Sequence, residues 1–216
     1  MNANTVFRTT NIIFLVKGLG MTVYITAIVV IVSLVVGILF ALMYLYGHKI
    51  LRTVVKVYIE LFRNTPILLW IMVVRFLIPL PLLVSGIFSM SLVTISGIAE
   101  DFRSGISMIP RGQWEAAESQ GLSKPQILRL VILPQVMRKL LPILLTEIVT
   151  VLKQSSFLWV IGVEELTGRG MILIGRMSDI GQICITYALL AAFYYIINDC
   201  VIRLAGKLRQ RQKISH

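Results

Sequence analysis

The 216-residue sequence has few charged residues, few cysteines and few histidines, and each shortage excludes a class of protein. Only 14% of the residues are charged, whereas soluble domains average about a quarter. The two cysteines, Cys184 and Cys200, lie several helical turns apart in one apolar run, so they cannot form a disulfide within that helix. The two histidines, His48 and His216, are far apart in sequence. No cysteine–histidine cluster therefore indicates a metal site.

The sequence also lacks the motifs of an enzyme. It contains no Gly-x-x-x-x-Gly-Lys-Ser/Thr loop that would hold ATP phosphates, and no nucleophile with a matching base. We expect no catalytic activity and no cofactor bound by this chain. The net charge of +11 raises nucleic acid as a partner. However, the basic residues gather at the ends of apolar runs and form no stripe with aromatic residues, so we exclude nucleic acid.

What the sequence does have is long apolar runs, with 57% hydrophobic residues overall. The stretch from Gly18 to Gly47 contains no charge, and one membrane span needs about 20 residues. In lipid every backbone polar group must be paired within its own segment, so these runs are expected to be helical. We predict an all-α membrane protein with a single transmembrane domain over residues 1–216. The expected spans are 18–47, 57–78, 82–99, 140–163 and 181–202, and a hydrophilic loop at 100–139 joins the third span to the fourth.

Lysine and arginine residues predict the orientation of this five-span bundle. The first loop holds three of them, the long loop six and the C-terminal tail five, whereas the N-terminal segment and the two remaining loops hold four in total. Positively charged residues stay in the cytoplasm. We therefore expect the long loop and the C-terminus in the cytoplasm, and the N-terminus on the outside.

The long loop has the pattern of a helix, a sharp bend and a second helix. Residues Gln113–Gln120 are good helix formers, and Gly121 follows where a helix C-terminal cap belongs. Ser123 is suited to cap the next helix. Pro125 falls early in that helix, where its missing N–H is tolerated, and Pro134 is expected to end or kink it. The pattern predicts a water-facing knob that inserts into a groove on a soluble partner.

The same loop carries a resemblance to a known family. Glu115-Ala116-Ala117, Gly121 four residues later and Val131-x-Leu133-Pro134 resemble the cytoplasmic signature loop of ABC-importer permeases. Val131 stands where that family usually has isoleucine, which preserves the apolar character. Two further stretches, Glu60–Pro66 and Ile98–Gln113, are similar to the subgroup that carries polar amino acids.

The resemblance implies a function and a set of partners. It implies a permease subunit of a histidine-, glutamate- or glutamine-type importer in the inner membrane of a bacterial cell. The partners it implies are a pair of ATP-binding subunits that hold ATP and Mg²⁺, a second permease chain (identical or homologous), an extracytoplasmic solute-binding protein and an amino-acid substrate. The residues it assigns to the coupling loop are Glu115, Ala116, Ala117, Gly121, Leu133 and Pro134.

Ionisable residues inside the expected spans are candidates for the substrate pathway, because charge is costly at membrane depth. Glu147 and Lys153 lie six residues apart, so they do not share a helix face. Arg75 can bind a carboxylate through two parallel hydrogen bonds, and Ser155 can add a further hydrogen bond. The two cations favour an acidic or amide substrate. A structural salt bridge to another span is the alternative for Glu147 and Lys153. For Arg75, which lies near the outer end of its helix, the alternative is a side chain that extends to the membrane interface.

Three other charges lie closer to the cytoplasmic ends of the expected spans. Glu60 and Arg63 are three residues apart on one helix face, which indicates a local ion pair or side chains that reach the interface. Asp199 is interpreted in the same way. We assign no pathway role to these three residues.

Two other functions remain open from the residues. An ion-coupled secondary transporter would use Glu147 and Lys153 as coupling groups, although no internal repeat is visible. A membrane scaffold would recruit a soluble partner through the Arg111–Pro142 stretch without moving any solute.

Overall fold

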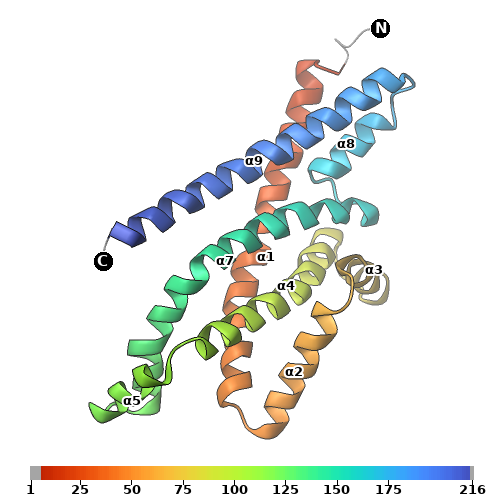
Figure 1. Cartoon of the computed structure of the whole chain (residues 1–216). Coiled ribbons are helices and arrows are strands. Elements are labelled where there is room, and N and C mark those ends of the chain that lie inside the picture. The colour runs from red at the N-terminus through yellow and green to blue at the C-terminus, as the bar shows by residue number, and fades with distance from the viewer. Residues whose placement is uncertain (1–5, 215–216) are drawn as a thin grey trace.

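The computed structural model of the protein describes residues 6–214, of which residues 205 and 208–214 are described by their backbone alone. Every regular element in this part of the chain is helical, as the apolar composition predicts (Figure 1). The α-helices are α1 (Thr9–Tyr46), α2 (Lys49–Arg63), α3 (Ile67–Leu77), α4 (Leu82–Ser107), α5 (Arg111–Ser119), α6 (Lys124–Gln126), α7 (Leu133–Gln154), α8 (Leu166–Ile174) and α9 (Ile180–Ile214).

Three helices in the described part of the chain are long and apolar enough to cross a membrane. These are α1, α4 and residues Ile180–Leu204 of α9. The pair α2–α3 makes a fourth if a bent pair counts as one span. The segment expected as the fourth span, 140–163, is not among them. It consists of the last two-thirds of α7 and a 3₁₀ turn at Ser155–Ile161, and this part of α7 contains the ionisable residues Glu147 and Lys153.

The segment expected as one span at 57–78 is two helices. Helices α2 and α3 meet at an angle of 107° across residues Asn64–Pro66. Pro66 has no N–H to continue the α-helical ladder, and a proline also disfavours the helical conformation of the residue before it. Pro66 instead adopts an extended conformation and begins α3. A proline within the expected span 57–78 predicts a loosened helix at this point, whereas the structure has a sharp corner.

The helix ends also differ from the expected span limits. Helix α4 continues through Ser107 instead of stopping near residue 99, and α9 continues well beyond residue 202. Glu100 and Arg103 are three residues apart and form an ion pair on the helix surface, so the charged end of α4 stays helical after the apolar run ends.

Helices α1 and α4 form the centre of the bundle because small residues let them approach closely. A Cβ on Gly37 of α1 would lie 2.8 Å from the Ile98 side chain and 3.2 Å from the backbone nitrogen of Ala99. Further along the same contact, the Ser33 hydroxyl donates to the Ser91 carbonyl at 3.5 Å. Small residues and interhelical hydrogen bonds are the means by which helices associate in lipid.

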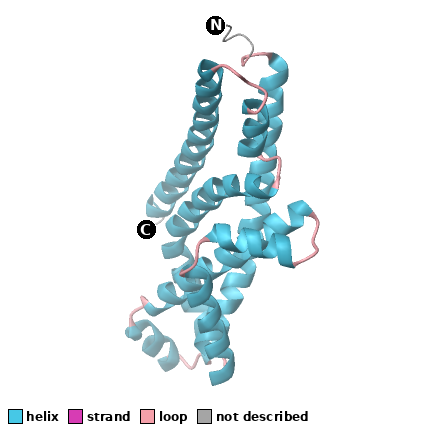
Figure 2. Ribbon diagram, turned by 90° about the vertical axis from the view of Figure 1, so that its right-hand side faces the viewer, coloured by secondary structure: helices cyan, strands magenta, loops and turns pink. Residues whose placement is uncertain are grey.

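The N-terminal end of α1 and the helix α5 lie at opposite ends of the molecule. The N-terminal end of α1 lies beside the α8–α9 connection, and α5 lies at the opposite end with the turn between α1 and α2 (Figures 1 and 2). Helix α5 packs there against the same apolar cluster as α1 and α4, which includes Ala41, Phe102 and Ala117. Helix α5 thus shares a buried apolar cluster with the central helices.

Candidate functional site

The helix–bend–helix predicted in the long loop is formed by α5, a turn and α6, which we call the elbow (Arg111–Gln126). Gly121 follows the end of α5 with a φ of +79°. Its N–H donates to the Glu118 carbonyl at 2.9 Å, and the Leu122 N–H donates to the Ala117 carbonyl at 3.3 Å. These bonds make a Schellman motif, which needs a left-handed residue at this position. The predicted role of Gly121 as the cap of the first arm is confirmed.

The second arm of the elbow begins at the predicted serine. Ser123 precedes α6, and both its N–H and its hydroxyl donate to Gln126 Oε1, at 2.9 and 2.8 Å. Gln126 therefore reaches back to the start of its own helix, as in a capping box. Pro125 lies in the first turn, where its missing N–H has no cost.

Pro134 does not end this second arm. Helix α6 continues through a π-helical segment, Ile127–Ile132, directly into α7. The Leu133 N–H donates to the Leu128 carbonyl five residues back, so the turn before Pro134 is wider than an α-helical turn. The wide turn gives the proline ring room, and the change of helix geometry lies before Pro134.

The residues assigned to the coupling loop divide into an outer and an inner set. Glu115 and Ala116 are exposed on α5, and Gly121 and Pro134 are exposed beyond it. Ala117 is 5% exposed and packs into the apolar cluster of α1 and α4. Gln135 Nε2 donates to Gln113 Oε1 at 3.1 Å, which ties α7 to α5. The outer face of α5 is thus free for contact while its inner face is anchored.

A cleft of about 290 Å³ lies between the α2–α3 corner, α4 and α7. We call it the polar cleft, after its polar lining residues Arg63, Thr65, Thr94, Ser96, Glu147, Thr150 and Gln154. Of the described lining residues, only Arg63 and Glu147 are ionisable. Thr94 Oγ1 is buried without a hydrogen-bond partner in the described structure. Gly97 leaves space beside Glu147, since a Cβ there would lie 3.8 Å from Glu147 Oε1.

The four residues predicted for the substrate pathway are not brought together. Glu147 lines the polar cleft, whereas Arg75, Lys153 and Ser155 do not. Ser155 is fully buried and donates to the Leu152 carbonyl at 2.8 Å. Lys153 is exposed and is not among the residues that line the polar cleft. The sequence did not point to Thr94 and Gln154, because their participation depends on which faces of α4 and α7 meet.

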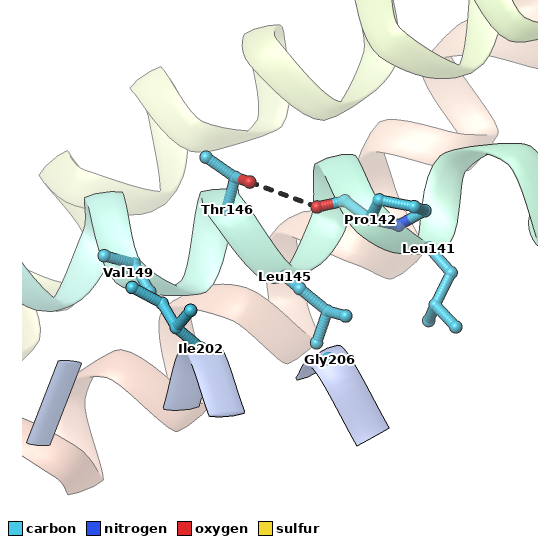
Figure 3. A pocket seen from close by; sticks show the side chains of 7 residues that line it. All are labelled: Leu141, Pro142, Leu145, Thr146, Val149, Ile202 and Gly206. Carbon is cyan, nitrogen blue, oxygen red and sulfur yellow. Dashed lines mark hydrogen bonds between the residues drawn. The ribbon is translucent and has the colours of Figure 1, made fainter. Parts of the chain in front are cut away.

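A second hollow, between α7 and the C-terminal part of α9, has a different character. It measures about 310 Å³ and is lined by apolar residues of both helices. The one hydrogen bond drawn there joins the Thr146 hydroxyl to the Pro142 carbonyl within α7 (Figure 3). No charged residue is among the seven that line it. This hollow therefore offers nothing to an ionic solute.

A buried carboxylate that the sequence analysis missed joins α1, α8 and α9. Glu165 has no exposed surface and precedes α8. Its carboxylate accepts from the N–H groups of Thr167 and Gly168 at 3.0 and 2.7 Å, from the Thr22 hydroxyl at 3.2 Å and from the Tyr194 hydroxyl at 3.0 Å. Ser/Thr/Asp/Asn dominate such helix caps, so a glutamate gave no signal in the sequence.

The burial of Glu165 predicts that the stability of the protein depends on pH. Burial raises the pKa of the Glu165 carboxyl, and the four hydrogen bonds to it only partly offset that effect. Because the pKa of this carboxyl is higher in the folded state than in the unfolded chain, its contribution to stability is full at pH values below the unfolded-state pKa. The contribution is lost as the pH rises through the folded-state pKa. We expect the thermal unfolding midpoint of the detergent-solubilised protein to fall as pH rises through that window.

The control is the neighbouring Glu164, which is exposed. Glu165→Gln should remove the pH dependence and lower the midpoint throughout, because an amide NH₂ facing these donors leaves buried groups unpaired. Glu164→Gln should keep the wild-type pH dependence. An unchanged slope in Glu165→Gln would show that another group is responsible.

Comparison with known proteins places this geometry in a family. Residues 33–214 match the profile of the family described as binding-protein-dependent transport system inner membrane component. The glutamine transport system permease protein of Escherichia coli (strain K12) is 34% identical over 207 residues, which cover 93% of each chain. A probable amino-acid ABC transporter permease protein of Bacillus subtilis (strain 168) is 33% identical over 94% of this chain and 90% of that protein.

Solved structures share the fold. The crystal structure of an amino acid ABC transporter with histidines superposes with a TM-score of 0.84 at 28% identity, over 92% of this chain and 94% of that chain. An inward-facing structure of the MetNI methionine ABC transporter superposes with a TM-score of 0.76 at 20% identity, over 93% of this chain and 99% of that chain.

Proposed function

Since the chain belongs to the family of binding-protein-dependent transport system inner membrane components, we propose that it imports glutamine through the polar cleft beside Glu147. The chain is the permease subunit of an amino-acid ABC importer, and the ATPase is a separate subunit. Among the relatives, the Escherichia coli permease and a probable permease of Bacillus subtilis are named for glutamine. The substrate class is therefore proposed from those names together with the chemistry of the cleft.

The observation that carries the proposal is the charge of the polar cleft. It contains one cation, Arg63, and one anion, Glu147. A zwitterion with an uncharged side chain matches this balance, because its carboxylate faces a guanidinium and its ammonium faces a carboxylate. Thr94, Thr150 and Gln154 supply neutral hydrogen-bonding groups suited to a side-chain amide. Of the two substrate types predicted from the sequence, the cleft favours the amide over the acid.

The elbow is the proposed contact with the ATPase. Its residues Glu115, Ala116 and Gly121 are exposed, as is Pro134 at the start of α7, and Ala117 packs into the apolar cluster of the bundle. We include Leu133, the half-buried residue before Pro134, in the same proposed contact region. A preformed helical knob of this kind suits a groove on a soluble partner. The Schellman motif and the packing of Ala117 support this role, because they hold the elbow in a fixed shape. A displacement of the elbow by the ATPase would then displace the apolar cluster that it shares with α1 and α4.

Five spans are proposed in place of the three or four that length and composition identify. The bent pair α2–α3 is the second span and α7 with the Ser155–Ile161 turn is the fourth. The N-terminal end of α1 and the elbow lie at opposite ends of the molecule (Figure 1). This supports an odd number of spans before the elbow, and therefore α2–α3 as the second span. With the basic loops in the cytoplasm, the N-terminus lies outside, and the C-terminus lies inside.

The assembly proposed contains two permease chains, two ATP-binding subunits and an extracytoplasmic solute-binding protein. This chain holds no nucleotide-binding loop, so the energy for transport must come from the ATPase subunits. The long apolar helices α1 and α9 expose residues such as Ile31 (63%) and Tyr195 (72%), which is expected of surfaces that face lipid or a second chain.

The test is reconstitution of the transporter with its ATPase and binding protein in proteoliposomes. We expect glutamine to stimulate ATP hydrolysis and to accumulate inside, while glutamate and lysine do neither to the same extent. Vanadate should stop the accumulation. Uptake that is insensitive to vanadate and driven by a proton gradient would instead indicate a secondary transporter. Binding of the soluble partner without any glutamine flux would indicate a scaffold.

A further inference from the structure

A charged cleft lies next to the polar cleft, between the C-terminal end of α1, the C-terminal half of α2 and the C-terminal part of α4. It measures about 260 Å³, and its charged lining residues are Lys56, Glu60, Arg63, Glu100 and Arg103. For Glu60 and Arg63 the sequence predicts a local ion pair or side chains that reach the interface, and among the described ion pairs the two residues are not paired with each other. Glu60 pairs with Lys56 at 3.6 Å, and Arg63 pairs across the cleft with Glu100 on α4 at 3.8 Å.

The two clefts adjoin at Arg63. Of the described lining residues, Arg63 alone belongs to both clefts. On α4, Gly97 lines the polar cleft and Glu100, one turn later, lines the charged cleft. Three residues correspond to about 4.5 Å along a helix axis. The two clefts thus follow one another along α4, with the Arg63–Glu100 ion pair at the boundary between them.

Glu100 is fixed, whereas Arg63 is loosely held. Arg103 donates to Glu100 from Nε at 2.8 Å and from Nη2 at 2.6 Å, and its guanidinium lies 5.5 Å from the centre of the Tyr44 ring on α1. The 3.8 Å between Arg63 Nη1 and Glu100 Oε1 exceeds a hydrogen-bond distance. Arg63 can therefore leave Glu100 without breaking a hydrogen bond, while Glu100 stays in place.

The backbone that carries Arg63 cannot easily follow such a movement. The Thr65 hydroxyl donates to the Leu61 carbonyl at 2.7 Å and accepts from the Trp70 indole N–H at 2.6 Å. The rings of Phe62 and Trp70 pack with their centres 4.3 Å apart. These contacts hold the backbone of the corner between α2 and α3 in place. We therefore expect any movement between the two clefts to involve the Arg63 side chain and not its backbone.

We propose that Arg63 is the gate between the polar cleft and the cytoplasmic charged cleft. This inference rests on the proposed function, because it takes the polar cleft as the place where the amino acid binds. With Arg63 paired to Glu100, its side chain crosses the junction and closes it. A substrate carboxylate competes for the guanidinium and offers two parallel hydrogen bonds in place of a long ion pair. The guanidinium then turns away from Glu100, and the junction opens.

The gate is tested by passive efflux. Proteoliposomes that contain the complete transporter are loaded with radiolabelled glutamine, and its loss is followed without ATP. Arg63→Gln removes the charge and shortens the side chain. We expect efflux roughly tenfold faster than in the wild type, which corresponds to a barrier lower by about 1.4 kcal/mol. ATP-driven accumulation should fall in the same variant.

Three matched variants separate a gate from a structural role. Arg63→Lys keeps a long cationic side chain, so its efflux should stay near the wild-type rate. Lys49→Gln removes one charge from an exposed position of α2 outside both clefts, and its efflux should not change. Glu100→Gln removes the anionic partner of Arg63 and leaves Arg63 itself in place. Its glutamine efflux should be as fast as that of Arg63→Gln.

The outcomes distinguish the gate from the proposed function. If wild-type transporter accumulates glutamine with ATP but Arg63→Gln leaks no faster than Lys49→Gln, the gate is overturned and the proposed function stands. If the wild type accumulates no glutamine, the proposed function fails. If Arg63→Gln does not assemble with the ATPase, the leak of Glu100→Gln decides: fast efflux supports the gate, and wild-type efflux overturns it.

Discussion

Gly121→Pro is expected to abolish ATP-driven uptake while the permease still inserts into the membrane. Proline fixes φ near −65° and has no N–H, whereas Gly121 has a φ of +79° and donates to the Glu118 carbonyl. The substitution therefore destroys the Schellman motif and reorients the second arm of the elbow. The elbow lies outside the expected spans, so the helices that insert are untouched. The measurement is ATP-driven glutamine uptake by the reconstituted transporter, with membrane insertion checked separately.

A graded series at this position tests the reason for the loss. No atom lies within 4 Å of a Cβ built on Gly121, so alanine and asparagine meet no steric obstacle and differ from glycine only in backbone preference. The left-handed conformation costs an ordinary residue about 1–2 kcal/mol, and asparagine less. We expect coupling to decrease in the order glycine, asparagine, alanine, proline. Equal activity in all four variants would show that the bend has no part in coupling.

The elbow could be predicted from the sequence because its structure is determined locally. Gly121, Ser123 and Pro125 act on backbone groups within a few residues of themselves, so their order along the chain was enough to place the bend. Pro66 also acts locally, and the sequence predicted a weak point there. The 107° angle was not predictable, because the packing of α2 and α3 against α4 sets its size.

The polar contacts between helices could not be predicted in the same way. The three-residue spacing of Glu60 and Arg63 is compatible with a pair on one helix, but α4 brings Glu100 to Arg63. The Glu165 carboxylate finds partners on α1 and α9 that lie more than 25 residues away in either direction. Such partners follow from which helix faces meet, and a single sequence does not contain that information in its spacing.

Glu147→Gln is expected to weaken glutamine binding by about 10- to 100-fold, since hydrogen bonds to charged groups contribute about 1.5–3 kcal/mol. The variant cannot attract an ammonium group in the polar cleft. Binding of radiolabelled glutamine should be measured on the purified permease–ATPase complex without the binding protein, whose own affinity would otherwise mask the change. Glu147→Asp keeps the charge on a shorter side chain and should lose less. Glu164→Gln, outside the cleft, should bind as the wild type does.

Stability and transport should respond to Glu147→Gln in opposite directions, which separates a substrate contact from a structural salt bridge. None of the ion pairs among the described residues includes Glu147, so the substitution breaks no pair within the chain. Removing an unpaired charge from a span reduces the cost of placing that helix in lipid. We expect the thermal midpoint of the variant to equal or exceed that of the wild type while its glutamine affinity falls. A lower midpoint with unchanged affinity would instead show that Glu147 is a structural group and that the ammonium binds elsewhere.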